Sequence, residues 1–230
     1  MKKSRLALAF AGMMLAAVFL SAEKNAFWTA RPYTEWTDKE VDKLLKDSPW
    51  ARTILLSTGP DESAQQRGRG GEESDAGLST AGNPPFRERP KLAITWYSRT
   101  IRQGVARRLL LANPASTEQA DHLLNRPPSQ FYEILVVGWN PGRNRDQALQ
   151  ALKEQTFLQK KNKEKIPLGD VILPVKRGDP LVLRFAREAN GKPVLVLEDK
   201  EVMLVLKHGE NTTRVPFKLS EMVVRDQLDL

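Results

Sequence analysis

Two histidines and a run of lysines are the residues of this sequence whose types could do chemistry. His122 and His208 stand far apart in polar surroundings, and a lone histidine without a partner pattern rarely serves as a general base. The chain has no cysteine, which argues against a zinc site, and no Gly-x-Ser-x-Gly motif. We therefore expect no catalytic residue, no metal site and no cofactor.

Basic side chains are the better candidates for a site. Four lysines fall within six positions after a predicted helix, and arginines are spread around an earlier predicted helix. We predict that these residues bind an anionic partner: Arg102, Arg107, Arg108, Lys160, Lys161, Lys163 and Lys165. Cations are also stabilised at a helix C-terminus, so a local role and a merely soluble surface are the alternatives.

The basic residues are concentrated in the middle of the chain. The formal net charge is +8, and residues 91–177 hold 15 basic against seven acidic residues. A basic region attracts anionic partners over long range. We expect these to be an anionic component of the cell envelope or another envelope protein, and not nucleic acid.

The first 22 residues have the pattern of a secretory signal peptide. Lys2, Lys3 and Arg5 precede an apolar run from Leu6 to Leu20, and small residues follow at 21–22. The run is shorter than the roughly 20 residues that cross a bilayer. We expect cleavage after residue 22 and an exported protein, periplasmic or extracellular, with no membrane span left. Retention as an anchor is the alternative.

The first predicted helix has clear boundaries. Thr37 and Glu40 form a capping box, and Trp36 and Val41 have the spacing of a hydrophobic staple. Pro49 disfavours a helical residue before it, so the helix ends there and an extended stretch follows over residues 50–56.

Aromatic residues surround this helix. Such rings could stack on sugars, or they could anchor the core, which we favour because the same residues serve as staple and packing groups. They are Phe27, Trp28, Tyr33, Trp36 and Trp50.

Residues 59–90 interrupt the pattern. They contain six glycines, four prolines and only two large apolar side chains, Leu78 and Phe86. Such a composition buries too little surface to offset the entropy of ordering. We predict a disordered insertion or linker.

Periodicity predicts the remaining elements. After a strand at 92–97 we expect a helix at 99–112 with the apolar stripe Ile101, Val105, Leu109 and Ala112. A short helix at 116–124, a strand at 131–137 and a helix from Asp146 to about Gln159 follow. Strands are then expected at 181–187, 194–198, 202–207 and 212–219, with hairpin turn signals between them. The fold class is α+β, an antiparallel sheet with a C-terminal β-meander and several amphipathic helices.

We divide the chain into four parts: a signal peptide (1–22), an N-terminal helix and strand (23–58), the insertion (59–90) and a main α+β domain (91–230). Three segments, YTEWTDKEVDKLLKDSPWA at 33–51, ITWYSRTIRQGVARR at 94–108 and FKLSEMVVRDQLDL at 217–230, resemble uncharacterised, predicted-secreted proteins of acidobacterial type. The resemblance implies export and a shared fold, and it assigns no activity and no catalytic residue.

The expected function is a non-enzymatic binding or structural role in the envelope. Two alternatives remain. One is a hydrolase-type enzyme without a local motif, which would need a pocket with convergent polar groups. The other is an assembly subunit that pairs through an exposed β-edge.

Overall fold

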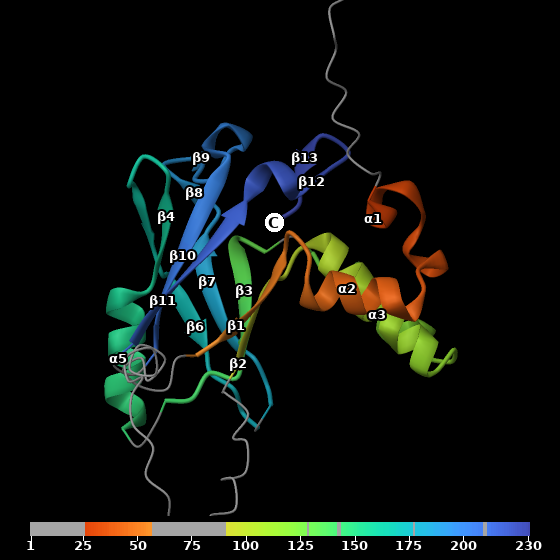
Figure 1. The fold of residues 1–230 in the computed structure, drawn as a ribbon, viewed down its shortest axis with the longest axis horizontal. Helices are drawn as coiled ribbons and strands as arrows, with labels where there is room; N and C mark the ends of the chain where they lie inside the picture. Colours follow the sequence, from red (N-terminus) through yellow and green to blue (C-terminus); the bar gives the residue numbers. More distant parts are fainter. Residues whose placement is uncertain (1–25, 57–90, 128, 142–143, 177, 209–210) are drawn as a thin grey trace, which may run out of the picture.

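The computed structural model describes residues 26–56, 91–127, 129–141, 144–176, 178–208 and 211–230. Within them, two antiparallel β-sheets pack face to face and helices flank the pair (Figure 1). The prediction of an α+β fold with antiparallel sheets is confirmed. The predicted signal peptide and the predicted insertion at 59–90 lie outside the described residues.

The described chain begins with three helical segments: α1 (Phe27–Ala30), the 3-10 turn η1 (Tyr33–Glu35) and α2 (Asp38–Lys46). The predicted capping box is present at the start of α2. The N–H of Glu40 donates to Oγ1 of Thr37 at 3.4 Å, and the N–H of Thr37 donates to Oε2 of Glu40 at 2.8 Å. Trp36, which precedes the cap, is fully buried. The helix therefore begins where the sequence predicts.

The first sheet has five strands in the order β1-β2-β3-β7-β6. Their bounds are Ala51–Leu55, Lys91–Trp96, Phe131–Val137, Leu181–Ala186 and Asp170–Ile172, respectively. In β2, β3 and β7 alternate residues are buried, as expected for strands with one face in the core. β1 pairs with β2, so the predicted N-terminal helix and strand belong to the same core as the main domain.

The second sheet has four strands in the order β11-β10-β4-β5, with bounds Asn211–Lys218, Glu201–His208, Phe157–Lys160 and Lys165–Pro167, respectively. Its inner face packs on the first sheet, where the rings of Trp96 and Phe217 lie edge to face with centroids 5.7 Å apart. The C-terminal region is rich in strands, as predicted. However, it is not one continuous meander, because β7 pairs with β3 and β6 and joins the first sheet.

Three further helices flank the sheets: α3 (Arg99–Ala112), α4 (Thr117–Leu124) and α5 (Arg145–Gln155). The bounds of α3 match the prediction, but its buried face does not. Gly104 is buried, and a Cβ there would lie 2.8 Å from Cδ2 of Leu44 on α2. The two helices approach each other through this glycine, so the apolar stripe expected through Val105 and Leu109 is only partly buried.

Short elements complete the fold: β8 (Glu188–Ala189), β9 (Lys192–Pro193), η3 (Leu197–Asp199), η4 (Leu219–Glu221), β12 (Val223–Val224) and β13 (Gln227–Leu228). The strand expected at 194–198 is not formed. The carboxylate of Asp199 accepts a hydrogen bond of 2.9 Å from the N–H of Val196, which closes a 3-10 turn instead. A side chain that bonds its own backbone competes here with strand pairing.

Candidate functional site

The three arginines predicted to bind an anion are occupied within the protein. Nε of Arg107 donates to the main-chain carbonyl of Trp36 at 2.7 Å, and Arg108 forms an ion pair with Asp42. Arg102 donates to the carbonyls of Leu123 and Arg126 at 3.4 and 3.2 Å. These contacts fasten α3 to its neighbours, so we assign the three side chains a structural role.

The predicted lysines lie in the β4–β5 hairpin, not after a helix. The expected helix to Gln159 ends at Gln155, because β4 pairs with β10 in the second sheet. The turn is closed by a 2.9 Å hydrogen bond from the N–H of Lys163 to the carbonyl of Lys160, with Lys163 at φ 69°. The pairing of β4 with β10 thus determines the conformation of this segment, and the local helix signals do not.

The four lysines differ in their surroundings. The Lys160 side chain is only 11% exposed and forms ion pairs with Glu164 at 3.4 Å and Asp199 at 3.5 Å, so it is already engaged within the protein. Lys161 and Lys163 are exposed, and the Nζ of Lys165 lies 4.4 Å from the centre of the Phe157 ring. Three of the four remain available at the surface.

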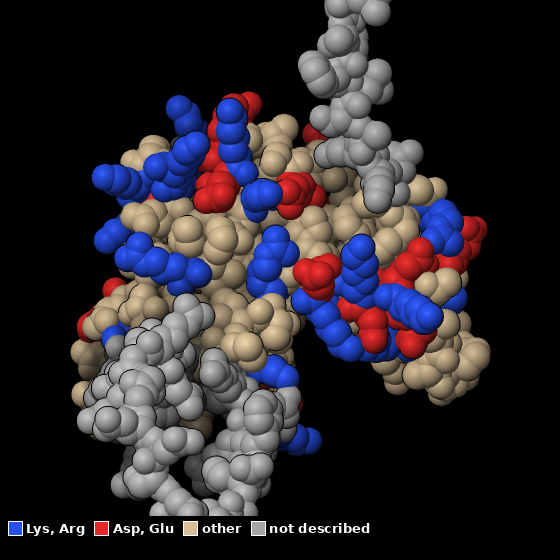
Figure 2. Space-filling model, viewed as in Figure 1, with Lys and Arg blue, Asp and Glu red and all other residues tan. Residues whose placement is uncertain are grey.

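The arginines and the lysines do not form one site. In Figure 1, α3 and β4 lie on opposite sides of the molecule. Figure 2 shows basic side chains gathered over the end that carries β4, β8 and β9, and a mixed cluster of basic and acidic side chains over α2 and α3. The predicted basic site is therefore divided in two.

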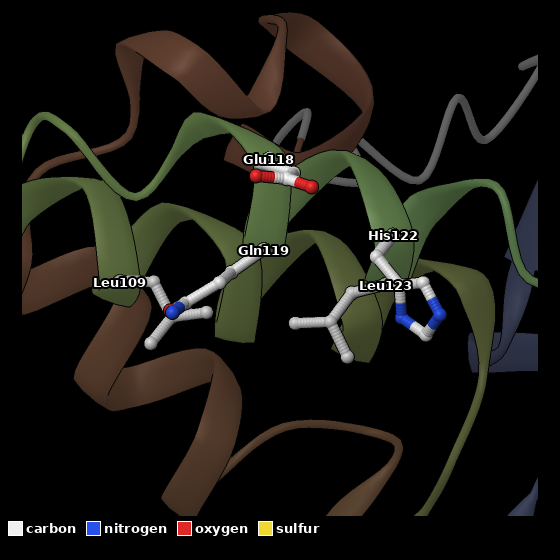
Figure 3. Close-up of a pocket in the computed structure, with 5 residues that line it drawn as sticks. All are labelled: Leu109, Glu118, Gln119, His122 and Leu123. Atoms are coloured by element: carbon white, nitrogen blue, oxygen red, sulfur yellow. The ribbon is translucent and has the colours of Figure 1, made fainter.

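The two histidines also lie apart. Nε2 of His208 is 2.6 Å from Oγ1 of Thr213, and burial lowers the pKa of His208 below its usual range, with Lys207 adding to the effect. His122 lines a shallow depression between α3 and α4 together with Leu109, Glu118, Gln119 and Leu123 (Figure 3). In that view the carboxylate of Glu118 and the imidazole of His122 lie apart and do not point toward each other.

Glu133 is the most deeply buried carboxylate of the described residues, 6% exposed on β3. It forms ion pairs with Arg126 at 3.0 Å and Arg184 at 3.1 Å, and Arg184 reaches Asp170 at 3.2 Å. Both oxygens of this carboxylate are therefore engaged by guanidinium groups. We assign it to the structural network of the first sheet.

A second pocket lies between α1 and η1, the start of α3 and the β12–β13 hairpin. It has a volume of about 590 Å³, within the range of small-molecule sites. Figure 1 places α1 and β12–β13 at the same end of the molecule. Its lining residues are Trp28–Tyr33, Arg99, Thr100, Gln103, Val224, Arg225 and Gln227–Asp229.

Asp229 positions two walls of this pocket. Its carboxylate accepts hydrogen bonds of 3.0 and 2.9 Å from the N–H groups of Arg99 and Thr100, at the positive end of α3. Its main-chain carbonyl accepts a bond of 2.6 Å from Nε1 of Trp50. The β12–β13 turn residues Arg225 and Asp226 have φ of 51° and 62°, as in the turns that suit tight hairpins.

The pocket walls carry three arginines and one aspartate. Arg31 forms an ion pair with Glu40, whose pKa is lowered by the hydrogen bond from the N–H of Thr37 and further by Arg31. Among the described residues the guanidinium groups of Arg99 and Arg225 have no ion pair or hydrogen-bond partner, and both residues are exposed. The carboxylate of Asp229 is already engaged by main-chain N–H groups. The guanidinium groups of Arg99 and Arg225 therefore remain free for a ligand.

The aromatic residues predicted from the sequence divide between core and pocket. Trp36 and Trp50 are fully buried, which confirms the core assignment for these two. Trp28 and Tyr33 are half-buried and line the pocket. Sequence reasoning missed Arg99 and Arg225 as site residues, because they come together only through the packing of the terminal hairpin on α3.

In the parts of the chain that the structure describes, no three His, Asp or Glu side chains converge as metal ligands. The same residues include no helix long and apolar enough to cross a membrane. Comparison with protein-family models, with curated proteins and with solved structures finds no match.

Proposed function

We propose that this protein is an exported, non-enzymatic binding protein that captures an anionic group in the pocket between α1, α3 and β12–β13. The observation that carries the proposal is the pair of guanidinium groups, on Arg99 and Arg225, that line the pocket without a partner. Arginine presents a planar set of donors that suits carboxylate and phosphate groups. The ligand is a component of the envelope or a group on another envelope protein.

Two observations favour this function over the alternatives. The contact between His208 and Thr213 is an arrangement of a base and a nucleophile, but neither residue lines either of the two pockets described above. Among the described residues no third group is bonded to the imidazole. A hydrolase would need that third group and a substrate cavity.

The edges of the second sheet also argue against assembly by strand addition. β11 carries Pro216, which has no N–H to offer a further strand, and the opposite edge strand, β5, has only three residues. Proline and short strands are the devices by which proteins protect sheet edges.

Export is part of the proposal and rests on residues 1–22. Mass spectrometry of the protein from its native host should find an N-terminus at Glu23. Intact Met1 on a protein that sediments with membranes would contradict export as a soluble protein.

The binding function is tested by calorimetric titration of residues 23–230 with citrate and with inorganic phosphate. We expect saturable binding that weakens as salt rises. The double variant Arg99→Gln/Arg225→Asn should lose at least tenfold in affinity, Asn being chosen because it tolerates the positive φ at 225.

The matched control removes two exposed charges away from the pocket, with Lys192→Gln/Arg214→Gln. It should bind both anions as the wild type does. Absence of saturable binding, or equal weakening in both double variants, would refute the proposed site.

A further inference from the structure

The pocket carries more than positive charge. Aromatic rings, side-chain amides and a hydroxyl stand beside the arginines in its walls. We propose that its ligand is an acidic saccharide, a sugar chain with a carboxylate on at least one ring. This inference rests on the proposed function and adds the chemical class of the ligand.

The aromatic side chains of the pocket provide a surface on which a sugar ring can pack. The ring of Trp28 packs edge to face against Phe27, with centroids 4.9 Å apart, and against Trp50 at 5.5 Å. These contacts fix its orientation while part of the side chain stays accessible. Tyr33 in η1 is likewise half-buried at the pocket wall. A ring that is already held in place loses little entropy when a flat, weakly polar surface packs on it, and the C–H face of a sugar is such a surface.

The side-chain amides supply hydrogen-bonding groups for sugar hydroxyls. Gln103 on α3 and Gln227 on β13 both line the pocket, and Thr29 adds a hydroxyl. A side-chain amide offers two donors and an acceptor, and the Thr29 hydroxyl, which already donates to the carbonyl of Ala26 at 2.8 Å, offers an acceptor. Such groups match the hydroxyls of a sugar, each of which donates and accepts. An inorganic anion would use only donors.

Arg99 and Arg225 supply a positive charge opposite the carboxylate of the saccharide. Both are exposed at the pocket and have no partner in the described residues. A volume of about 590 Å³ accommodates more than one sugar ring, so the rings and the arginines can act on neighbouring units of one chain.

The test compares three probes by calorimetry on residues 23–230: trigalacturonate, the neutral oligosaccharide maltotriose and inorganic phosphate. We expect trigalacturonate to bind at least tenfold more tightly than phosphate and maltotriose to bind weakly or not at all. Arg99→Gln and Tyr33→Leu should each weaken trigalacturonate at least fivefold. Only Arg99→Gln should weaken phosphate.

Thermal unfolding of each variant checks that the fold is retained, and Arg214→Gln is the matched charge control. If phosphate and trigalacturonate bind equally and Tyr33→Leu changes neither, the saccharide inference is wrong while the anion-binding function stands. If neither anion binds, the proposed function fails as well. Tight binding of maltotriose would show that charge does not select the ligand, and would also refute the inference.

Discussion

The indole Nε1 of Trp50 donates a hydrogen bond of 2.6 Å to the main-chain carbonyl of Asp229, a residue 179 positions away in the sequence. Trp50 itself is fully buried, and the carboxylate of Asp229 binds the first N–H groups of α3. One residue near the end of the chain thus joins the core, the helix and the terminal hairpin. The pocket exists because these three meet.

We expect Asp229→Asn to destabilise the protein by about 1 to 3 kcal/mol. The amide can accept one of the two N–H bonds, but its NH₂ group faces the other donor, and hydrogen bonds to a charged group are worth about 1.5 to 3 kcal/mol. Chemical denaturation measures the change. Asp226→Asn makes the same chemical change in the same hairpin, at a positive φ that Asn tolerates, and should be close to neutral. Equal effects of the two changes would show that the carboxylate of Asp229 is not needed.

Trp36→Ala should cost about 3 to 5 kcal/mol, because removal of a fully buried ring leaves a cavity in the core. Its Nε1 also donates to the carbonyl of Arg31 at 3.2 Å, so the change loosens a pocket wall as well. Trp36→Phe, which keeps most of the apolar volume, should cost clearly less. The measurement is the free energy of unfolding in urea, and a neutral effect of Trp36→Ala would contradict the burial.

Replacement of residues 59–90 by a short Gly/Ser linker should leave the fold intact. Leu55 on β1 and Lys91 on β2 are paired in register, so the two strands can be joined by a short hairpin connection. We expect the thermal midpoint to change by less than about 4 °C, which corresponds to roughly 1 kcal/mol for a protein of this size. A larger decrease would show that the replaced residues contribute to stability.

The His208 side chain should make stability depend on pH. Burial lowers the pKa of His208 in the folded state, so below the ordinary value of about 6.5 the unfolded chain binds a proton that the folded protein does not. Stability is therefore full above pH 6.5 and falls as the pH decreases from there through the folded-state pKa. His208→Gln should reduce the slope between pH 7 and pH 5 in denaturation experiments. An unchanged slope would mean that other groups cause the dependence.

The binding of anionic partners by the lysines of the β4–β5 hairpin stays a prediction. The triple change Lys161→Gln/Lys163→Gln/Lys165→Gln should weaken binding to phosphatidylglycerol vesicles about tenfold or more, since each lysine near an anionic membrane contributes about 1 kcal/mol. Lys160 is left in place because it is paired with Asp199.

The matched control for this experiment is Lys39→Gln/Lys43→Gln/Lys46→Gln on α2, which removes the same charge at the other side of the molecule. Vesicle sedimentation at low and high salt provides the measurement. If both triple variants bind alike, net charge and not the hairpin governs the association.

Elements whose signals are local could be predicted from the sequence. The capping box of Thr37 and Glu40 needs only two residues three positions apart, and it places the start of α2 correctly. The ends of α3 follow from Ser98, whose side chain accepts from the N–H of Ile101, and from Asn113-Pro114. Its buried face did not follow, because that depends on where Leu44 approaches Gly104.

The features that the sequence did not predict depend on contacts between residues far apart in the chain. The local sequence of the β4 segment predicts the end of a helix, but the segment forms a strand because it pairs with β10. The lysines therefore lie in a hairpin and not at a helix terminus. The site was missed for the same reason. Arg99 and Arg225 have no common motif, and only the packing of β12–β13 near α3 brings them to one pocket.

The Trp50–Asp229 contact also has a consequence for the order of events during synthesis. One wall of the pocket is made by residues 28–33 and another by residues 224–229, so the binding surface cannot form before residues 224–229 have left the ribosome. A ligand of this pocket would bind only chains that contain the β12–β13 hairpin. Its binding energy would then stabilise the folded protein over shorter, incomplete chains, and a product that lacks the β12–β13 hairpin would not bind the ligand.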